Sequence, residues 1–224
     1  MPGRRVMQIA AVSAAAMGIS AYAFGGWATI TVDDLPETVV AGRAHTLSFI
    51  VRQHGVTPLG GLSPSVTATN GRTEVAGVVT PGATGHYSSR VTFPAAGDWA
   101  ITVRSGFMNA QIRLPSVRAL AVGAAAPPAL PPAERGKRLF VAKGCVTCHV
   151  HGATASLGYT SLAVGPELTP KRYEAAYLRR FLIDPSIART PGRAEMPVLG
   201  LSNAELTSLV AFINADRSVA AARR

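Results

Sequence analysis

Apolar and polar residues alternate over short stretches in the first half of the chain, and this period of two predicts β-strands. The alternating stretches are 28–32, 45–52, 74–79, 87–93 and 99–103, with a weaker one at 109–114. Clusters of Gly, Pro and Asn separate them, and Asn70-Gly71 is a pair that favours a hairpin turn. Short strands at this spacing predict that residues 24–118 form an all-β module, an immunoglobulin-like antiparallel sandwich.

Helical periodicity replaces this alternation in the second half of the chain. The pattern predicts one helix over residues 133–143 and another over 172–183, where Pro185 stops it. A third helix begins after Ser202, which is a good N-cap, and Glu205 three positions later completes a capping box. Its predicted buried stripe consists of Leu206, Leu209, Val210 and Ile213. Residues 133–224 are therefore predicted to form an all-α domain.

A stretch rich in Ala and Pro, residues 119–132, separates the two predicted domains. Proline favours an extended, semi-rigid backbone, so this stretch is interpreted as a linker. At about 3.1 Å per residue, the part from Val122 to Pro132 could reach roughly 30 Å. We therefore expect the second domain to be held on a tether beside the first.

The first 23 residues resemble an export signal. Arg4 and Arg5 precede an apolar stretch at 6–19, and Ala-Tyr-Ala at 21–23 fits a cleavage site. The alternative is an uncleaved N-terminal membrane anchor, in which the apolar stretch continues toward Ile30. Both readings place the remaining chain outside the cytoplasm, in the periplasm or another extracytoplasmic space, and the second adds membrane association.

The composition and charge of the chain limit which classes of partner it is expected to bind. The chain has 224 residues with a formal net charge of +10, and 48% of them are hydrophobic. The basic residues are scattered and form no run, which argues against nucleic-acid binding. Residues 132–224 contain thirteen Lys and Arg against seven Asp and Glu, whereas residues 24–131 contain seven against five. The excess positive charge belongs mainly to the second domain and favours acidic partners or anionic surfaces.

The only two cysteines lie in Cys145-Val-Thr-Cys148-His149, a C-x-x-C-H motif. Two thiols at this spacing can add to the two vinyl groups of one haem, and the adjacent histidine is then placed under the iron. A thioredoxin-like pair would need a βαβ context, which is missing from the pattern here. A zinc site would need a second ligand pair, and His151 is the only other nearby histidine. The motif therefore predicts one covalently bound haem c.

Met196 is the only methionine in the second domain, and it lies on an irregular segment between two predicted helices. Such a segment can bring a thioether to the other face of the haem, although a methionine that merely fills the core is the alternative. His45, His54 and His86 could bind copper in the β module, but their separations fit no compact metal motif and favour surface positions.

Residues 133–214 resemble a class I c-type cytochrome. The landmarks occur in the order of that family and are Gly136, Phe140, the C-x-x-C-H motif, Gly165-Pro166, Met196-Pro197 and Phe212. The resemblance implies that the Pro166 carbonyl holds the ring of His149 and that His149 and Met196 are the axial ligands. It also implies that Gly136, Phe140 and Phe212 pack the first helix on the last. The stretch from His151 to Val164 is longer than in the shortest members of the family.

The run from Gly85 to Val103 resembles the closing strands of small exported immunoglobulin-like modules of the YtkA-like type. Together the two resemblances imply an extracytoplasmic one-electron carrier or electron-transfer subunit rather than an enzyme. The β module would dock it to a redox protein with an acidic surface, such as a terminal oxidase, a quinol-oxidising complex or a photosynthetic reaction centre. A haem peroxidase or a gas-sensing haem protein is the alternative, and it needs an open or labile sixth coordination position.

Overall fold

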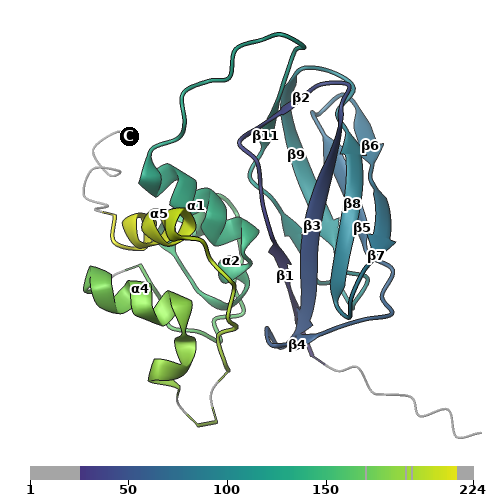
Figure 1. The fold of residues 1–224 in the computed structure, drawn as a ribbon. Helices are drawn as coiled ribbons and strands as arrows, with labels where there is room; N and C mark the ends of the chain where they lie inside the picture. The colour runs from purple at the N-terminus through teal and green to yellow at the C-terminus, as the bar shows by residue number, and fades with distance from the viewer. Residues whose placement is uncertain (1–25, 170, 190, 193, 216–224) are drawn as a thin grey trace, which may run out of the picture.

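The structure, a computed structural model, describes residues 26–169, 171–189, 191–192 and 194–215 of the chain. Two layers of β-sheet form one half of the molecule, and a group of helices packs against one side of them (Figure 1). The predicted signal peptide or anchor lies outside the described residues. Among the helices that are described, none is long and apolar enough to cross a membrane.

The β module contains two sheets. The first has the order β1 (Ala28–Val32), β3 (Ala44–Gln53), β8 (His86–Thr92) and β7 (Val78–Pro81), with β4 (Thr57–Pro58) paired to β3. The second has the order β2 (Thr38–Val40), β11 (Val117–Leu120), β9 (Gly97–Arg104), β5 (Ser65–Thr69) and β6 (Glu74–Ala76), with β10 (Gln111–Arg113) paired to β9. The prediction that this half is all-β is confirmed.

Inward-facing side chains of both sheets make one core. Trp99, Phe49 and Phe93 are completely buried, and the rings of Phe93 and Trp99 meet edge to face with centroids 5.7 Å apart. The indole nitrogen of Trp99 donates a hydrogen bond to the Ala95 carbonyl at 3.0 Å, so this buried polar group is satisfied. The core therefore consists of protein side chains alone.

One predicted strand is wrong in its boundaries. Residues 74–79 were expected to form a single strand, but β6 and β7 belong to different sheets and Gly77 separates them. A Cβ atom on Gly77 would lie 2.2 Å from the Ser89 hydroxyl oxygen and 2.8 Å from a Val91 methyl carbon. The chain therefore changes sheets at the one residue that lets the backbone approach β8 so closely.

The strands β2, β4, β5 and β11 were not predicted. β2 and β11 are a parallel pair, Thr38 with Arg118 through Val40 with Leu120, and they come from opposite ends of the module's sequence. Asn70-Gly71 does form the turn between β5 and β6, where the Asn70 side chain accepts hydrogen bonds from the amides of Arg72 and Thr73. Local turn chemistry was thus readable from the sequence, whereas short strands held by distant partners were not.

The helical half contains α1 (Pro132–Ala142), α2 (Cys145–Cys148), α3 (Gly152–Ala155), α4 (Ala175–Ile183), the 3-10 helix η1 (Pro185–Ala188) and α5 (Asn203–Ile213). The capping box at α5 is present as predicted, because the side chain of Ser202 accepts from the Glu205 amide and Glu205 accepts from the Ser202 amide. α4 begins later than predicted, since the Glu174 carboxylate caps it by accepting from the amides of Ala176 and Tyr177.

The two halves pack against each other through β1, an edge strand of the first sheet. All five residues of β1 are buried. Ala28, Ile30 and Val32 belong to the hydrophobic core. Thr29 and Thr31 point to the other face, and they are 5% and 3% exposed. The residues that follow α1 lie against them, and Arg52 of β3 also contacts Thr31. The helical domain therefore shields an edge that would otherwise be open to pairing with another chain.

Polar contacts join the halves on both sides of β1. On α1, Arg135 pairs with Glu37 at 2.9 Å, and Arg138 donates to the carbonyls of Ser116 at 2.7 Å and Pro36 at 3.2 Å. Farther along, the Tyr159 hydroxyl donates to the Arg113 carbonyl at 2.8 Å. The linker runs from β11 to α1 as an arch at the top of the molecule (Figure 1). The expectation of a tethered, separate second domain is wrong, since these contacts form one packed unit.

Candidate haem-attachment site

The frame of the site is the contact between α1 and α5. A Cβ atom on Gly136 would lie 1.9 Å from the Ser208 carbonyl oxygen, so only glycine permits this close approach of the two helices. Phe140 of α1 and Phe212 of α5 pack with ring centroids 5.4 Å apart, and both side chains are buried. The predicted packing of the first helix on the last through these residues is what the structure shows.

The segment that follows α1 turns the chain toward the C-x-x-C-H motif. Gly144 has a φ of 79°, a left-handed conformation that suits glycine, and it precedes α2. Cys145 and Cys148 lie three positions apart in this single helical turn, so the two side chains face the same way. Both are half-buried thiols with no disulfide. Burial raises the pKa of Cys145 to about 12 and that of Cys148 to about 11, so the free thiols stay protonated at neutral pH.

His149 follows α2 in an extended conformation, and its ring is fixed by two contacts. Its Nδ1 atom lies 2.9 Å from the Pro166 carbonyl oxygen. Because a carbonyl can only accept, Nδ1 carries the proton and Nε2 keeps its lone pair. A Cβ atom on Gly165 would lie 2.4 Å from the Cε1 atom of this ring, so the Gly165-Pro166 segment lies directly against the imidazole.

Burial lowers the pKa of His149, and the hydrogen bond to Pro166 offsets part of this effect. The ring is therefore held neutral at neutral pH, which is the form that can donate a lone pair to a metal. Pro166, identified from sequence only by resemblance, lies where its carbonyl can orient the His149 ring. Such second-layer orientation is a general feature of histidine ligands.

These residues fit a covalently bound haem. Two thiols on one face of a helical turn, followed at once by an imidazole with one free nitrogen, supply the attachment chemistry and one axial ligand. The close packing of Gly165 against the ring is a second observation that favours ligation over an ordinary surface histidine. Among the described residues no group of three His, Cys, Asp or Glu side chains could hold a bare metal ion. His54 and His86 are exposed, as the surface interpretation expects, whereas His45 is partly buried.

Met196 lies on the irregular segment between η1 and α5. Its side chain is partly buried and packs against the hydrophobic core, as it would in either of the two roles considered for it. An ion pair between Arg189 and Glu195 spans the start of this segment. The turn between β3 and β4 approaches it as well, since a Cβ atom on Gly55 would lie 3.9 Å from the Glu195 carbonyl oxygen.

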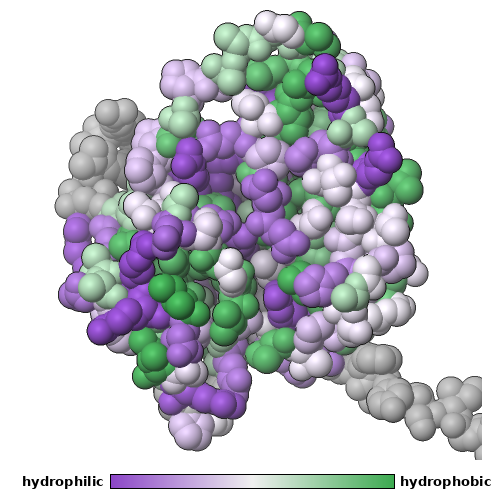
Figure 2. Space-filling model, in the orientation of Figure 1, coloured by the Kyte–Doolittle hydropathy of each residue, from purple (hydrophilic) through white to green (hydrophobic). Residues whose placement is uncertain are grey.

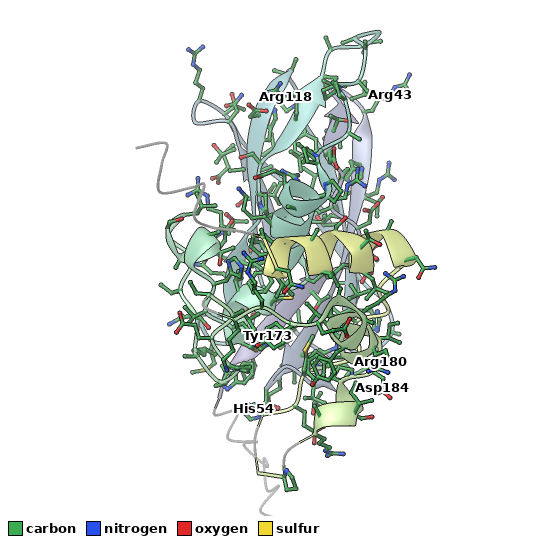
Figure 3. The ribbon with its side chains drawn as sticks, turned by 90° about the vertical axis from the view of Figure 1, so that its left-hand side faces the viewer. Arg43, His54, Arg118, Tyr173, Arg180 and Asp184 are labelled. Atoms are coloured by element: carbon green, nitrogen blue, oxygen red, sulfur yellow. The ribbon has the colours of Figure 1, made fainter. Side chains whose placement is uncertain are left out.

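Figure 3 shows His54, from this turn, at the same end of the molecule as Asp184, which precedes η1. The ring of His54 packs edge-on against Trp27, with centroids 5.6 Å apart. The β module therefore contacts the helical domain beside two segments. One begins at Gly144, whose Cβ position would lie 2.6 Å from the Ile30 carbonyl oxygen, and leads into the C-x-x-C-H motif. The other contains Glu195 and carries Met196.

Two residues of the site were not given roles by the sequence. His151 is 1% exposed and stacks on Phe212 with centroids 4.1 Å apart, in the core where α1 meets α5. From the sequence, His151 has a role only as a zinc ligand, which the missing second ligand pair argues against. Lys143 is the other, a buried lysine at the end of α1. Neither carries a local signal, because burial at these positions depends on elements far away in the chain.

Comparison with known proteins identifies the helical domain. Residues 133–215 match the family model described as cytochrome c. No curated protein sequence matches the chain. Among solved structures, a similar chain is the ZirS C-terminal domain, with 14% identity over 54% of this chain and 87% of that chain. The TM-score of this likeness is 0.30, which is too low to support any conclusion.

Proposed function

We propose that this protein, whose residues 133–215 form a cytochrome c domain with covalently bound haem c, is a one-electron carrier or electron-transfer subunit that works outside the cytoplasm. The observation that carries the proposal is the fixed His149 ring, directly after the two thiols of the C-x-x-C-H motif, with Nδ1 donating to Pro166. Haem c, when bound, supplies an iron that accepts and releases one electron.

The chain's own residues would divide the work as follows. Cys145 and Cys148 hold the cofactor through thioether bonds, and Nε2 of His149 is one axial ligand. The Pro166 carbonyl keeps the ring oriented by accepting a hydrogen bond from Nδ1–H. We assign the second ligand of the iron to the sulfur of Met196, because it is the only methionine in residues 133–224 and its segment lies between η1 and α5. A thioether ligand would favour a higher reduction potential than a second imidazole. With both ligands supplied by side chains, the iron would have no open position for a substrate, which favours electron transfer over the peroxidase and gas-sensing alternatives.

The assignment of Met196 is tested by replacing it with alanine. Met196→Ala should lower the reduction potential and allow the reduced protein to bind carbon monoxide, whereas the wild type should not bind it. Met108→Ala is the matched control, since Met108 is 70% exposed in the β module and should leave both properties unchanged. Carbon monoxide binding by the wild type would favour the gas-sensing alternative. An unchanged potential in Met196→Ala would show that this side chain only fills the core.

The partner is inferred from the surface of the cytochrome domain. Apolar side chains gather at the lower left of the face in Figure 2, over α4 and the segment leading into α5. Exposed members of this group include Tyr177, Ile183, Ile187 and Val198. The basic residues Arg179 and Arg180 lie on α4, and Arg189, which is paired with Glu195, follows η1. An apolar centre with positive charge around it suits a redox protein with an acidic rim, such as a terminal oxidase, a quinol-oxidising complex or a reaction centre.

This electrostatic proposal predicts a salt effect. The rate of electron exchange with an acidic partner should fall as added salt shortens the Debye length below about 10 Å.

We also propose that the β module, as an exported immunoglobulin-like unit, contributes docking surface to the same assembly. Because β1 is packed against the haem domain, the module would act as a rigid part of the docking surface and not as a tether.

A further inference from the structure

Lys143 is the most deeply buried cation in the described part of the cytochrome domain. Its side chain is only 5% exposed, at the end of α1 and two positions before Cys145. Taking a charged ammonium group out of water is costly unless other groups compensate for the lost hydration. Its partners therefore show which arrangement of the chain this residue stabilises.

Those partners come from both domains. The ammonium nitrogen donates to the Asp33 carbonyl oxygen at 2.5 Å, just beyond the end of β1. It also pairs with the Glu205 carboxylate at 2.8 Å, and Glu205 is the same residue that completes the capping box of α5. One side chain thus connects the end of α1, the start of α5 and the end of β1.

The backbone of the same residue makes a further contact with β1. The Thr31 hydroxyl donates to the Lys143 carbonyl at 3.4 Å, and it accepts in turn from Arg52 at 3.0 Å. The following residue, Gly144, is pressed against the strand, since a Cβ atom there would lie 2.6 Å from the Ile30 carbonyl oxygen. The chain therefore leaves α1 along β1 and enters the C-x-x-C-H motif from there.

We propose that Lys143 is a positioning residue through which β1 and α5 set the path of the haem-attachment segment, residues 144–149. The β module is then part of the construction of the haem site and not only a docking unit. This inference rests on the proposed function only in that it takes residues 145–149 as the attachment segment. If the ion pair of Lys143 only stabilised the fold, its removal would lower the melting temperature without changing the haem. That difference makes the proposal testable.

The first experiment uses the full chain with its haem and compares Lys143→Met with Lys137→Met. Met keeps most of the length of the side chain but removes the charge. Lys137 is the control because it lies on the same helix, is 32% exposed and pairs only with Glu134 among the ion pairs of the described residues. We expect Lys143→Met to shift the reduction potential and to lower the fraction of chains that carry covalent haem, while Lys137→Met matches the wild type in both.

The second experiment keeps the test informative if Lys143→Met does not fold. Thr31→Val removes the hydroxyl that contacts Lys143, and Thr29→Val is its control. Thr29 is on the same face of β1 and equally buried, but its hydroxyl has no hydrogen-bond partner among the described residues. We expect Thr31→Val to shift the potential in the same direction as Lys143→Met by a smaller amount, and Thr29→Val to leave it unchanged.

The outcomes separate this inference from the proposed function. If Lys143→Met lowers the melting temperature but leaves potential and haem content as in Lys137→Met, the positioning role is wrong. Equal reduction potentials in Thr31→Val and Thr29→Val would show that β1 does not position the haem-attachment segment through the Thr31 hydroxyl. A wild-type chain that carries no covalent haem after denaturation would instead overturn the haem assignment itself.

Discussion

The β module and the cytochrome domain reach their folds by different means. In the β module, two sheets enclose side chains such as Trp99, Phe49 and Phe93, which are completely buried by other protein atoms. In the cytochrome domain, the protein's own core is concentrated where α1 meets α5. Long irregular segments run between α3 and α4 and between η1 and α5, and they carry exposed apolar residues such as Leu157, Leu162 and Val198.

This difference shows where each domain obtains its order. The β module is specified by hydrophobic packing and by register between strands. The irregular segments of the cytochrome domain are instead held by single contacts, such as Pro166 with His149 or Tyr159 with the Arg113 carbonyl. We expect the covalent haem c of this family to complete their packing. Substitutions should therefore affect the two domains in different ways.

The largest effect is expected from the double substitution Cys145→Ser and Cys148→Ser. It should abolish covalent haem and remove most of the helical signal, while the β module keeps its own structure because its core contains no cofactor. Haem staining after denaturation and far-ultraviolet circular dichroism would measure the two effects. Full helical content without haem would show that the cytochrome domain, like the β module, forms its core from protein side chains without the cofactor.

Trp99→Ala should produce the opposite pattern. Removing a completely buried ring that packs on Phe93 should cost about 3–5 kcal/mol. Denaturant unfolding would measure this loss, while the haem absorption spectrum under native conditions should stay that of the wild type. A large spectral change would mean that the core of the β module supports the haem directly, which would weaken the contrast between the domains.

Gly136→Ala tests the α1–α5 contact with a single added methyl group. The new Cβ would lie 1.9 Å from a backbone oxygen, so the helices must move apart, at a cost of up to about 3 kcal/mol. Lys137→Ala, one position along the same helix, should stay within about 0.5 kcal/mol because its site is on the surface. If the two variants unfold at the same denaturant concentration, this contact does not limit the stability of the domain.

The smallest effect concerns the pH dependence of the ion pair between Lys143 and Glu205, which joins the end of α1 to the start of α5. Burial opposes ionisation of Glu205, but the bonds from Lys143 and Ser202 outweigh it and lower the pKa of this carboxyl below its usual value. A lowered folded-state pKa gives stability that is present above the unfolded pKa, near 4.3, and is lost as the pH falls through the folded value.

The melting temperature of Glu205→Gln should therefore fall below that of the wild type at neutral pH and converge with it under acid conditions. Glu74→Gln, an exposed position in β6, is the control and should show no such convergence. A difference that stays constant down to low pH would assign the effect to lost packing and not to charge.

Much of the site could be predicted because its signals are local in the sequence. The spacing of Cys145, Cys148 and His149 is fixed by the chemistry of haem attachment, and one helical turn is enough to present it. The cap at Ser202 and Glu205 and the turn at Asn70-Gly71 depend on residues no more than three positions apart. Alternation likewise located β8, and a helical period located α1, because both patterns report which face of a single element is buried.

Only the tertiary structure decided which of these elements meet. The sequence treated 74–79 as one strand because its alternation is continuous, but the close approach of β8 divides it at Gly77. It treated the Ala/Pro stretch as a tether because composition describes the stiffness of a linker and not the surfaces it joins. Thr31 of β1 and the lysine at the end of α1 are 112 positions apart in the chain, so no local pattern reveals that they meet. Burial of polar groups across a contact between domains depends on residues that are distant in the sequence, so only the tertiary packing determines it.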